Sequence, residues 1–293
     1  MTDLVLHPMS FGQILDGAFA LYRRHLPAMI GIVAVLYGPV MIAFVVFFGS
    51  MATMYAPEAV DPADIIALSG GFFLLYLFAL LSYTAVQGAL TQAVSDAFLT
   101  RHVSIGRACL AALRRLLPLV GGALLKGLLI TVLSLLGLVA LIPLGIAAAL
   151  GVDSTVLAVG GGIVGTLAVL TLMSVGWAMF FAVTPAIILE RAGPAQGIVR
   201  STRLARGRWI RILLVLSVAI LIPLVLWLGA LVVASLLIPN PVVGQVVSQL
   251  IAVALMPYYA ICVVLLYYDA RIRSEGFDLA VLAEQLRPAA GAP

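Results

Sequence analysis

Few side chains in this chain could do chemistry, and they stand out because their surroundings are apolar. Lys126 is the only basic residue inside a long apolar run, and the amides Gln87, Gln92 and Gln245 fall in or near other apolar runs. A charged or strongly polar group inside hydrocarbon is costly, so by default it marks a functional site. These four residues are our candidate intramembrane polar site, either a binding site or the lining of a substrate pathway.

Each of these residues also has a plainer interpretation. A lysine at the edge of a span extends its ammonium group to the lipid headgroups, and the third apolar run is long enough to begin near Gly127. Amides inside a membrane hydrogen-bond between helices, at about 0.6 kcal/mol each. We favour these interpretations over a substrate pathway, and the sequence leaves both open.

A second group of candidate residues is an arginine cluster between the fourth and fifth apolar runs. Its members are Arg200, Arg203, Arg206, Arg208 and Arg211. Each basic residue near a membrane surface contributes about 1 kcal/mol of attraction to anionic headgroups. We therefore predict that the cluster contacts anionic lipids, although the same arginines also serve as an orientation signal.

Motifs for catalysis and for metal binding are missing from the sequence. It contains no phosphate-binding loop, nucleophile elbow or HExxH motif, and its acids fall in loops or at the ends of apolar runs. His7, His25 and His102 do not have metal-ligand spacing. We therefore expect a protein that is not an enzyme and that uses no catalytic residue, cofactor or metal.

The composition indicates a membrane protein. Hydrophobic residues make up 64% of the 293 residues and charged residues only 10%, whereas soluble domains are about 25% charged. Six apolar runs reach the roughly 20 residues that a membrane-crossing helix needs. They span about 27–50, 66–95, 119–149, 156–189, 209–238 and 243–268. The third and fourth exceed one crossing, so we expect each to tilt, break or project from the bilayer.

The distribution of arginines predicts the orientation of these spans. All 15 arginines precede the first span, follow the last, or lie between the second and third or the fourth and fifth. The other loops carry acids but no Lys or Arg. Because basic residues in short loops stay on the cytoplasmic side, we predict that both termini are cytoplasmic. The formal charge of +4 therefore reflects topology, and we expect no nucleic-acid partner.

The chain also has the pattern of a threefold internal repeat within one membrane domain, 1–293. The units cover about 10–97, 104–191 and 193–270, followed by a short cytoplasmic tail, 271–293. Each unit is predicted to contain an interfacial amphipathic helix, an outward span, a short turn and an inward span. The predicted fold class is therefore an all-α membrane protein with six transmembrane helices, arranged as three two-span repeats with cytoplasmic interfacial amphipathic helices.

The interfacial helices have recognisable sequences. The first, 10–25, places Phe11, Ile14, Ala18 and Tyr22 at helical spacing, the second covers 104–115, and the third begins at Gly193 and Pro194. Residues 275–287 are a candidate for a fourth helix. An acid and then an arginine recur where each inward span ends: Asp96 and Arg101, Glu190 and Arg191, Asp269 and Arg271.

Three stretches resemble a known family. They are SFGQILDGAFALYRRH at 10–25, TPAIILERAGPAQGIVRSTRLARGRW at 184–209 and LLYYDARIRSEGFDLAVL at 265–282. They resemble bacterial multi-pass proteins of the family named after the glycerophosphoryl diester phosphodiesterase membrane domain. That resemblance implies a protein of the bacterial plasma membrane that acts with other envelope proteins. The catalytic barrel of the phosphodiesterase has no counterpart in the sequence, so no active-site residue is carried over.

Two functions fit these observations. The first is a non-enzymatic accessory or scaffold component of a bacterial envelope complex, in contact with membrane lipids and other envelope proteins. The alternative is a transporter or lipid-handling protein with a pathway between the repeats, lined by Gln87, Gln92, Lys126 and Gln245. An intramembrane enzyme of lipid metabolism ranks third, because the sequence shows no catalytic motif.

Overall fold

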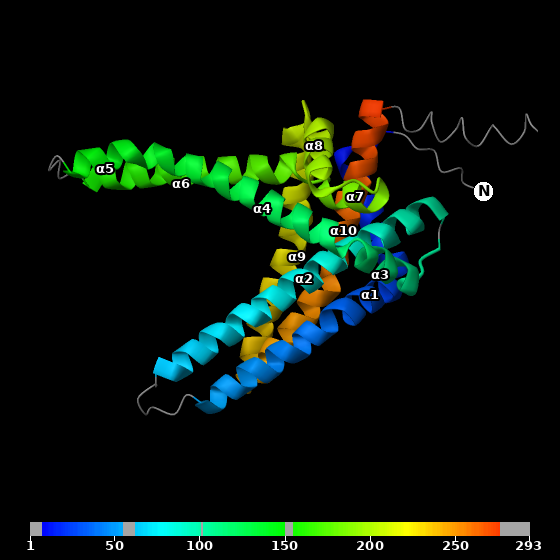
Figure 1. Ribbon diagram of the computed structural model, residues 1–293, viewed down its shortest axis with the longest axis horizontal. Coiled ribbons are helices and arrows are strands. Elements are labelled where there is room, and N and C mark those ends of the chain that lie inside the picture. The colour runs from blue at the N-terminus through cyan, green and yellow to red at the C-terminus, as the bar shows by residue number, and fades with distance from the viewer. Residues whose placement is uncertain (1–7, 55–61, 101, 150–154, 276–293) are drawn as a thin grey trace, which may run out of the picture.

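Long helices dominate the structure, a computed structural model that describes residues 8–54, 62–100, 102–149 and 155–275 (Figure 1). Every regular element in these residues is a helix, and six helical stretches are long and apolar enough to cross a membrane. The all-α fold class and the six spans are therefore confirmed. The threefold repeat and the extent of the domain stay predictions.

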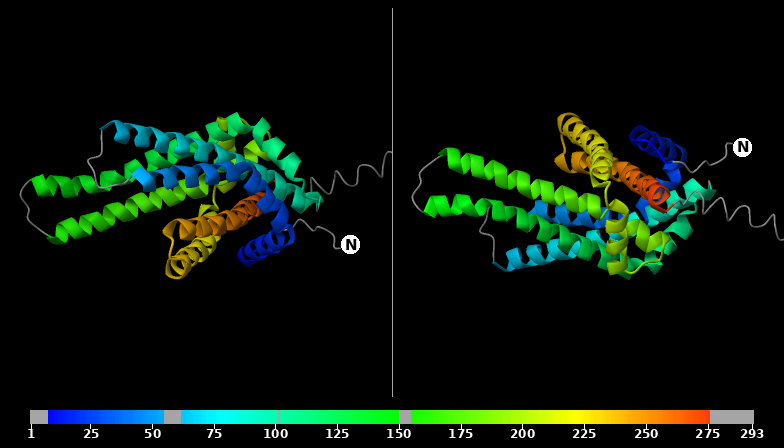
Figure 2. Two further views of the ribbon diagram at one scale, coloured as in Figure 1. Left: turned by 90° about the horizontal axis from the view of Figure 1, so that it is seen from below. Right: turned by 90° about the horizontal axis from the view of Figure 1, so that it is seen from above.

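The long helices form three hairpins, each made of consecutive segments. The first consists of α1 (Phe11–Met54) and α2 (Pro62–Thr100). The second runs through α4 (Leu116–Leu138), the 3₁₀ turn η1 (Val139–Leu141), α5 (Ile142–Ala149), α6 (Thr155–Met179) and α7 (Val183–Leu189). The third consists of α9 (Trp209–Leu237) and α10 (Pro241–Glu275), and the short helices α3 (Ile105–Arg114) and α8 (Pro194–Ala205) connect the hairpins. The hairpins diverge from a shared base, where α3, α7 and α8 lie (Figures 1 and 2).

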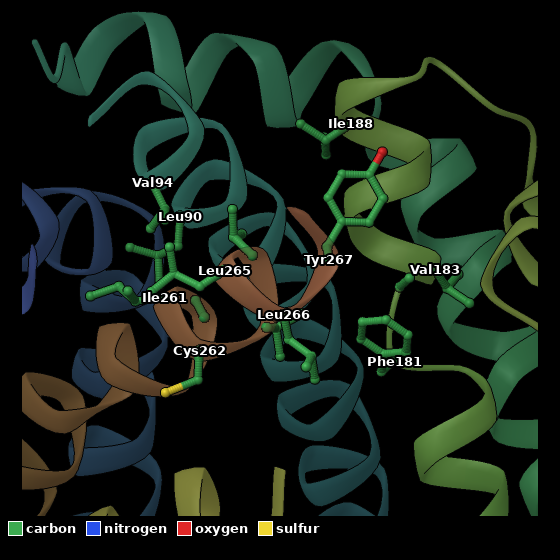
Figure 3. Packing of buried hydrophobic residues seen from close by; sticks show 14 of the residues in the cluster. Leu90, Val94, Phe181, Val183, Ile188, Ile261, Cys262, Leu265, Leu266 and Tyr267 are labelled. Atoms are coloured by element: carbon green, nitrogen blue, oxygen red, sulfur yellow. The ribbon is translucent and has the colours of Figure 1, made fainter. Parts of the chain in front are cut away.

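The buried core lies at this base. Leu90 and Val94 of α2 pack beside Ile261 and Leu265 of α10 (Figure 3). Tyr267 is the largest fully buried side chain of the core. The arms of the hairpins, in contrast, expose large apolar side chains along their length, among them Phe73, Leu167 and Leu236. Apolar outer faces are what lipid-facing helices require, so the protein is packed at its base and lipid-facing along its arms.

Two of the long spans are broken, and a proline explains each break. Proline has no N–H, and its ring collides with the carbonyl four residues earlier. For Pro143 that carbonyl belongs to Val139, the first residue of the 3₁₀ turn η1. For Pro185 it belongs to Phe181, inside the turn between α6 and α7. The excess length of the third and fourth predicted spans therefore corresponds to breaks in the helices.

A buried serine satisfies the backbone at the second break. Ser201 of α8 is fully buried and donates its hydroxyl hydrogen to the carbonyl of Met179 at 2.8 Å. The same hydroxyl oxygen accepts the backbone N–H of Ala182 at 2.9 Å. Because unpaired backbone groups are costly when buried, this one side chain stabilises the break and fixes α8 against it.

The predicted interfacial helix over 10–25 is not a separate element. It continues into the first span as α1, through Pro27 and Pro39, up to Met54. Its first turns lie at an angle to the rest of α1 (Figure 2). They pack along α10, where the hydroxyl of Tyr22 donates to the carbonyl of Ala254 at 2.9 Å. The apolar stripe predicted for a membrane surface is thus partly used inside the protein, since Ile14 and Ala18 are fully buried.

The other expected short helices are separate elements. α3 follows Ser104, and α8 begins at Pro194 with Gly193 as its N-cap, as the sequence predicts. A proline in the first turn is favourable because its missing N–H has no partner there in any case. Most of the candidate helix over 275–287 lies outside the described residues, since the description ends at Glu275.

Close packing of α4 against α6 depends on a glycine, and we predict that Gly137→Ala destabilises the protein. A Cβ atom at Gly137 would lie 2.7 Å from the Cα of Val169 and 2.8 Å from its backbone nitrogen, so the two helices must move apart. Overpacking of this kind costs about 1–3 kcal/mol. We expect the SDS concentration at half-unfolding of the detergent-purified protein to fall.

Gly127→Ala in the same helix is the matched control for this prediction. A Cβ atom there meets no neighbouring atom within 4 Å, so its midpoint should stay at or above that of the wild type. Equal midpoints for Gly137→Ala and the wild type would contradict the close contact between α4 and α6.

Candidate functional site

Carboxylates gather at the shared base and accept hydrogen bonds from arginines of several helices. We call this group the inner ion-pair layer; its acids are Asp96 of α2, Glu190 after α7, and Asp269 and Glu275 of α10. Each of the first three acids lies where a returning span reaches the base. The layer therefore connects the ends of all three hairpins.

Asp269 ties the beginning of the chain to the third hairpin. Its carboxylate is almost completely buried and accepts the backbone N–H of Met9 at 2.8 Å. It also pairs with Arg273 at 3.0 Å and with Arg211 of α9 at 3.3 Å. Both arginines donate in addition to the carbonyl of Met9. A buried charge with this many partners is well compensated, so Asp269 holds three segments in one arrangement.

Glu190 ties the second hairpin to the third. Its carboxylate accepts two nitrogens of Arg200 in α8, with the closest contact at 2.8 Å, and the hydroxyl of Tyr267 in α10. Arg200 also reaches the carboxylate of Glu275. These hydrogen bonds, chiefly those that Arg200 donates to Glu275, raise the pKa of Arg200 above its ordinary value. Arg200 is therefore permanently charged and held from two sides.

Asp96 ties the first hairpin to α3. It accepts Arg107 at 2.8 Å and the side-chain amide of Gln92 at 3.0 Å. Directly before Asp96 and Asp269, Ser95 and Tyr268 share a buried hydrogen bond of 2.7 Å between α2 and α10. The first hairpin is thus fixed both to its following helix and to the third hairpin.

For Glu190 and Asp269, the arginine that follows in the repeat pattern is not the closest partner in the layer. Arg191 follows Glu190 directly, but neighbouring residues do not face each other. Arg191 has a left-handed φ of 56° in the turn before α8, is exposed, and uses its carbonyl to accept Arg115. Arg271 lies on the Glu275 side of α10, and Arg101 lies outside the described residues.

The structure divides the predicted lipid-contacting arginine cluster in two. Arg200, Arg208 and Arg211 are held by protein groups, Arg208 by the carbonyl of Arg273 at 3.1 Å. Arg203 and Arg206 are exposed, and no ion pair within the described residues involves them. Within the described part of the chain, Arg203 and Arg206 are thus the exposed members of the cluster.

A cavity of about 430 Å³ lies between α2, α6, α9 and α10. We call it the central cavity. Five side chains with hydrogen-bonding groups line it: Tyr83, Gln87, Trp177, Trp227 and Tyr259. The remaining wall is apolar and includes Ala219, Ile220, Pro223, Leu224, Ala252, Leu255 and Met256.

The central cavity lies well away from the inner ion-pair layer along the helices. Tyr259 precedes Asp269 by ten residues in α10, which corresponds to about 15 Å at 1.5 Å per residue. Gln87 precedes Asp96 by nine residues in α2, or about 13 Å. Since the hydrocarbon core of a bilayer is about 30 Å thick, this distance corresponds to roughly half of its depth.

The four residues of the candidate polar site do not gather in one place. Gln87 lines the central cavity and hydrogen-bonds to Tyr83. Lys126 is not among the lining residues, but its Nζ lies 4.6 Å from the ring centre of Trp177, which is. Gln92 belongs to the inner ion-pair layer. The side chain of Gln245 lies outside the described residues.

The position of Lys126 bears on its two interpretations. α4 begins at Leu116, so Lys126 lies about 15 Å along the helix instead of at its start. The ammonium group faces an aromatic ring, and a cation over a tryptophan face is attracted by its electrons. The interpretation as an edge residue requires a span that begins near Gly127, eleven residues later than α4 does.

Sequence reasoning missed the aromatic members of the cavity wall. Trp177, Trp227 and Tyr259 resemble ordinary apolar residues of a span, because each carries a large hydrophobic ring. The Nε1 atom of Trp227 is buried and has no acceptor within the described residues. Buried Trp and Tyr usually find a partner for their polar atom, so a tryptophan in mid-span was the available signal.

Fold and sites together define a multi-pass all-α membrane protein, joined at one end by an ion-pair layer and hollowed between its hairpins. A family model described as "Domain of unknown function (DUF7847)" matches residues 9–270, and the chain belongs to that family. No curated protein and no solved structure matches the chain. These comparisons provide no evidence for the resemblance to the glycerophosphoryl diester phosphodiesterase membrane domain.

We predict that Asp269→Asn strongly destabilises the protein. The substitution removes the charge that compensates Arg273 and Arg211, and leaving a buried charge unpaired costs about 3–5 kcal/mol. The midpoint of thermal unfolding in detergent should fall by several degrees. It is measured as the temperature at which half of the monodisperse protein is lost from solution. Asp16→Asn is the control, because Asp16 is exposed on α1 and no salt bridge of the described residues includes it. Equal losses in both variants would contradict a special role of Asp269.

Proposed function

We propose that this protein is a non-enzymatic accessory or scaffold component of an envelope complex in a bacterial plasma membrane. The inner ion-pair layer is the observation that supports this role. It fixes the ends of three hairpins and two short helices to one another, through contacts such as Glu190–Arg200 and Asp96–Arg107. A rigid layer of this kind suits a docking platform better than a moving gate.

The short helices offer surface for a partner. α8 buries Ile198, Ser201 and Leu204 against the protein and exposes Val199 and Arg203. α3 likewise buries Ala108 and Ala112 and exposes Leu110 and Leu113. Apolar side chains interspersed with arginine are typical of protein interfaces and of headgroup contacts. We assign this outward surface to a protein partner and to anionic lipid headgroups.

The orientation of the protein follows from the arginines. Five arginines belong to the inner ion-pair layer, namely Arg107, Arg200, Arg211, Arg271 and Arg273. Basic residues are retained in the cytoplasm. We therefore place the layer and both termini on the cytoplasmic side. Arg203 and Arg206 in particular would then contact the headgroups. Arg200, Arg208 and Arg211 are instead bound to groups within the protein.

The platform is tested by purifying the tagged protein from native membranes in a lipid-preserving extract. We expect a protein partner near one-to-one and enrichment of anionic lipids, both identified by mass spectrometry. Arg203→Gln with Arg206→Gln should weaken anionic-lipid binding roughly thirty-fold, since each arginine contributes about 1 kcal/mol. Arg203→Lys with Arg206→Lys keeps the charge and should bind like the wild type. Partner-free, monodisperse protein from native membranes would contradict the scaffold role.

A lipid-handling or transport protein is the second candidate, and the central cavity is the observation that favours it. The cavity brings Gln87 to the meeting point of all three hairpins, and Lys126 contacts Trp177 in its wall. Ligand sites in membrane proteins are often formed where such units meet near the middle of the bilayer. This arrangement supports a pathway that includes Gln87 and Lys126 but not Gln92.

Lipid transfer between proteoliposomes tests this second candidate. Gln87→Ala and Lys126→Ala should each abolish a transfer or flux that the wild type catalyses. Gln92→Ala is the control, because the Gln92 amide contacts Asp96 instead of the cavity, and its transfer rate should be retained. Full activity of Gln87→Ala and Lys126→Ala would remove both residues from the pathway.

A further inference from the structure

We propose that the central cavity binds the uncharged, carbonyl-bearing end of a membrane lipid. The proposal rests on the second candidate function only in using the same cavity. It requires binding and does not require transport, so the two can fail separately.

Most of the cavity wall is apolar, and hydrogen-bond donors predominate among its few polar side chains. The indole groups of Trp177 and Trp227 can only donate, and the hydroxyls of Tyr83 and Tyr259 can donate as well. Gln87 supplies the one side-chain carbonyl and two further N–H groups. A ligand that complements this wall brings acceptors, and carbonyl oxygens are the commonest uncharged acceptors of lipids.

One donor in this wall lacks a partner. The Nε1 atom of Trp227 is buried, and the described residues provide no acceptor for it. A buried polar group without a hydrogen bond is costly in a medium of low polarity. Trp227 is part of the cavity wall, so a carbonyl bound against the edge of its ring would supply the acceptor that the described chain does not.

The charge and depth of the cavity favour an uncharged ligand. No Asp, Glu, Lys or Arg is among the described residues of its wall, and the Lys126 ammonium lies on the ring of Trp177 instead. The cavity is also about 13–15 Å from the inner ion-pair layer along the helices. An ionic headgroup at that depth would be expensive to desolvate without a countercharge.

The apolar part of the wall suits a hydrocarbon chain. Ile220, Leu224, Leu255 and Met256 contribute side chains without hydrogen-bonding groups, and methionine adapts to chains of irregular shape. A volume of about 430 Å³ lies within the range of small-molecule sites, about 300–1,000 Å³. The lipid around the diverging hairpins is the nearest source of such a ligand (Figure 1).

Photolabelling of the full-length protein in nanodiscs tests the proposal and separates two sources of the same chemistry. One probe is a diazirine-bearing diacylglycerol, and the other is a diazirine-bearing isoprenoid quinone. We expect one of them to label peptides from α9 and α10 around Trp227 and Tyr259, and the unmodified lipid to compete. Labelling by the first identifies an ester lipid, and labelling by the second a quinone. Labelling of these peptides by neither probe would overturn the proposal.

Two variants and a control connect the labelling to the cavity. Trp227→Phe removes the N–H donor and keeps a ring, and it should reduce labelling about tenfold. Ala219→Trp fills the cavity and should abolish labelling, whereas Leu221→Trp on an exposed face of the same helix should not change it. Wild-type labelling of Trp227→Phe and Ala219→Trp, with wild-type unfolding midpoints, would overturn the proposal. Bound lipid without lipid transfer would refute the second candidate function alone.

Discussion

Buried carboxylates at one end of the helices are the constraint on which the rest of this structure depends. An apolar helix surface is as stable against lipid tails as against another apolar helix, so hydrophobicity alone does not specify which helices pack together. Asp96, Glu190 and Asp269 supply that specification, because each needs the arginines that compensate its charge. Arg200 joins Glu190 to Glu275 of the third hairpin. Asp269 and its two arginines also bind the backbone of Met9, just before the first hairpin, so satisfying the acids brings the ends of all three hairpins together.

The remainder of the architecture follows from that anchorage at one end. Along the arms, contact is maintained pairwise within a hairpin, where small residues let helices approach; Gly137 meets the backbone of Val169 in this way. Between hairpins no comparable ion pairs occur among the described residues of the arms, and the hairpins diverge (Figure 1). A space bounded by α2, α6, α9 and α10 results, with aromatic and amide groups in its wall.

The local structure was largely predictable from residue patterns, and the exceptions have physical causes. Pro143 and Pro185 break their helices at the carbonyl that each obstructs, whereas Pro39 and Pro223 lie inside unbroken helices. Tertiary contacts account for the difference at Pro185, because Ser201 of the following helix α8 hydrogen-bonds to the backbone at the break. Likewise the start of α1 reads as a surface helix, and only its contact with α10 shows that Ile14 and Ala18 are buried.

The sequence by itself determined the number of spans and predicted a common side for the arginines, because hydrophobic length and the position of charges are local properties. It also determined that Gln87 and Lys126 are unusual in their surroundings. Only the tertiary structure decided that Gln87 lines a cavity and that the Lys126 ammonium contacts the ring of Trp177 in its wall. It also showed that the Gln92 amide donates to Asp96. It likewise decided that Arg203 and Arg206 are exposed, whereas Arg200 and Arg211 form ion pairs with acids. Which distant residues contact each other depends on how the helices pack, and the linear sequence does not contain that arrangement.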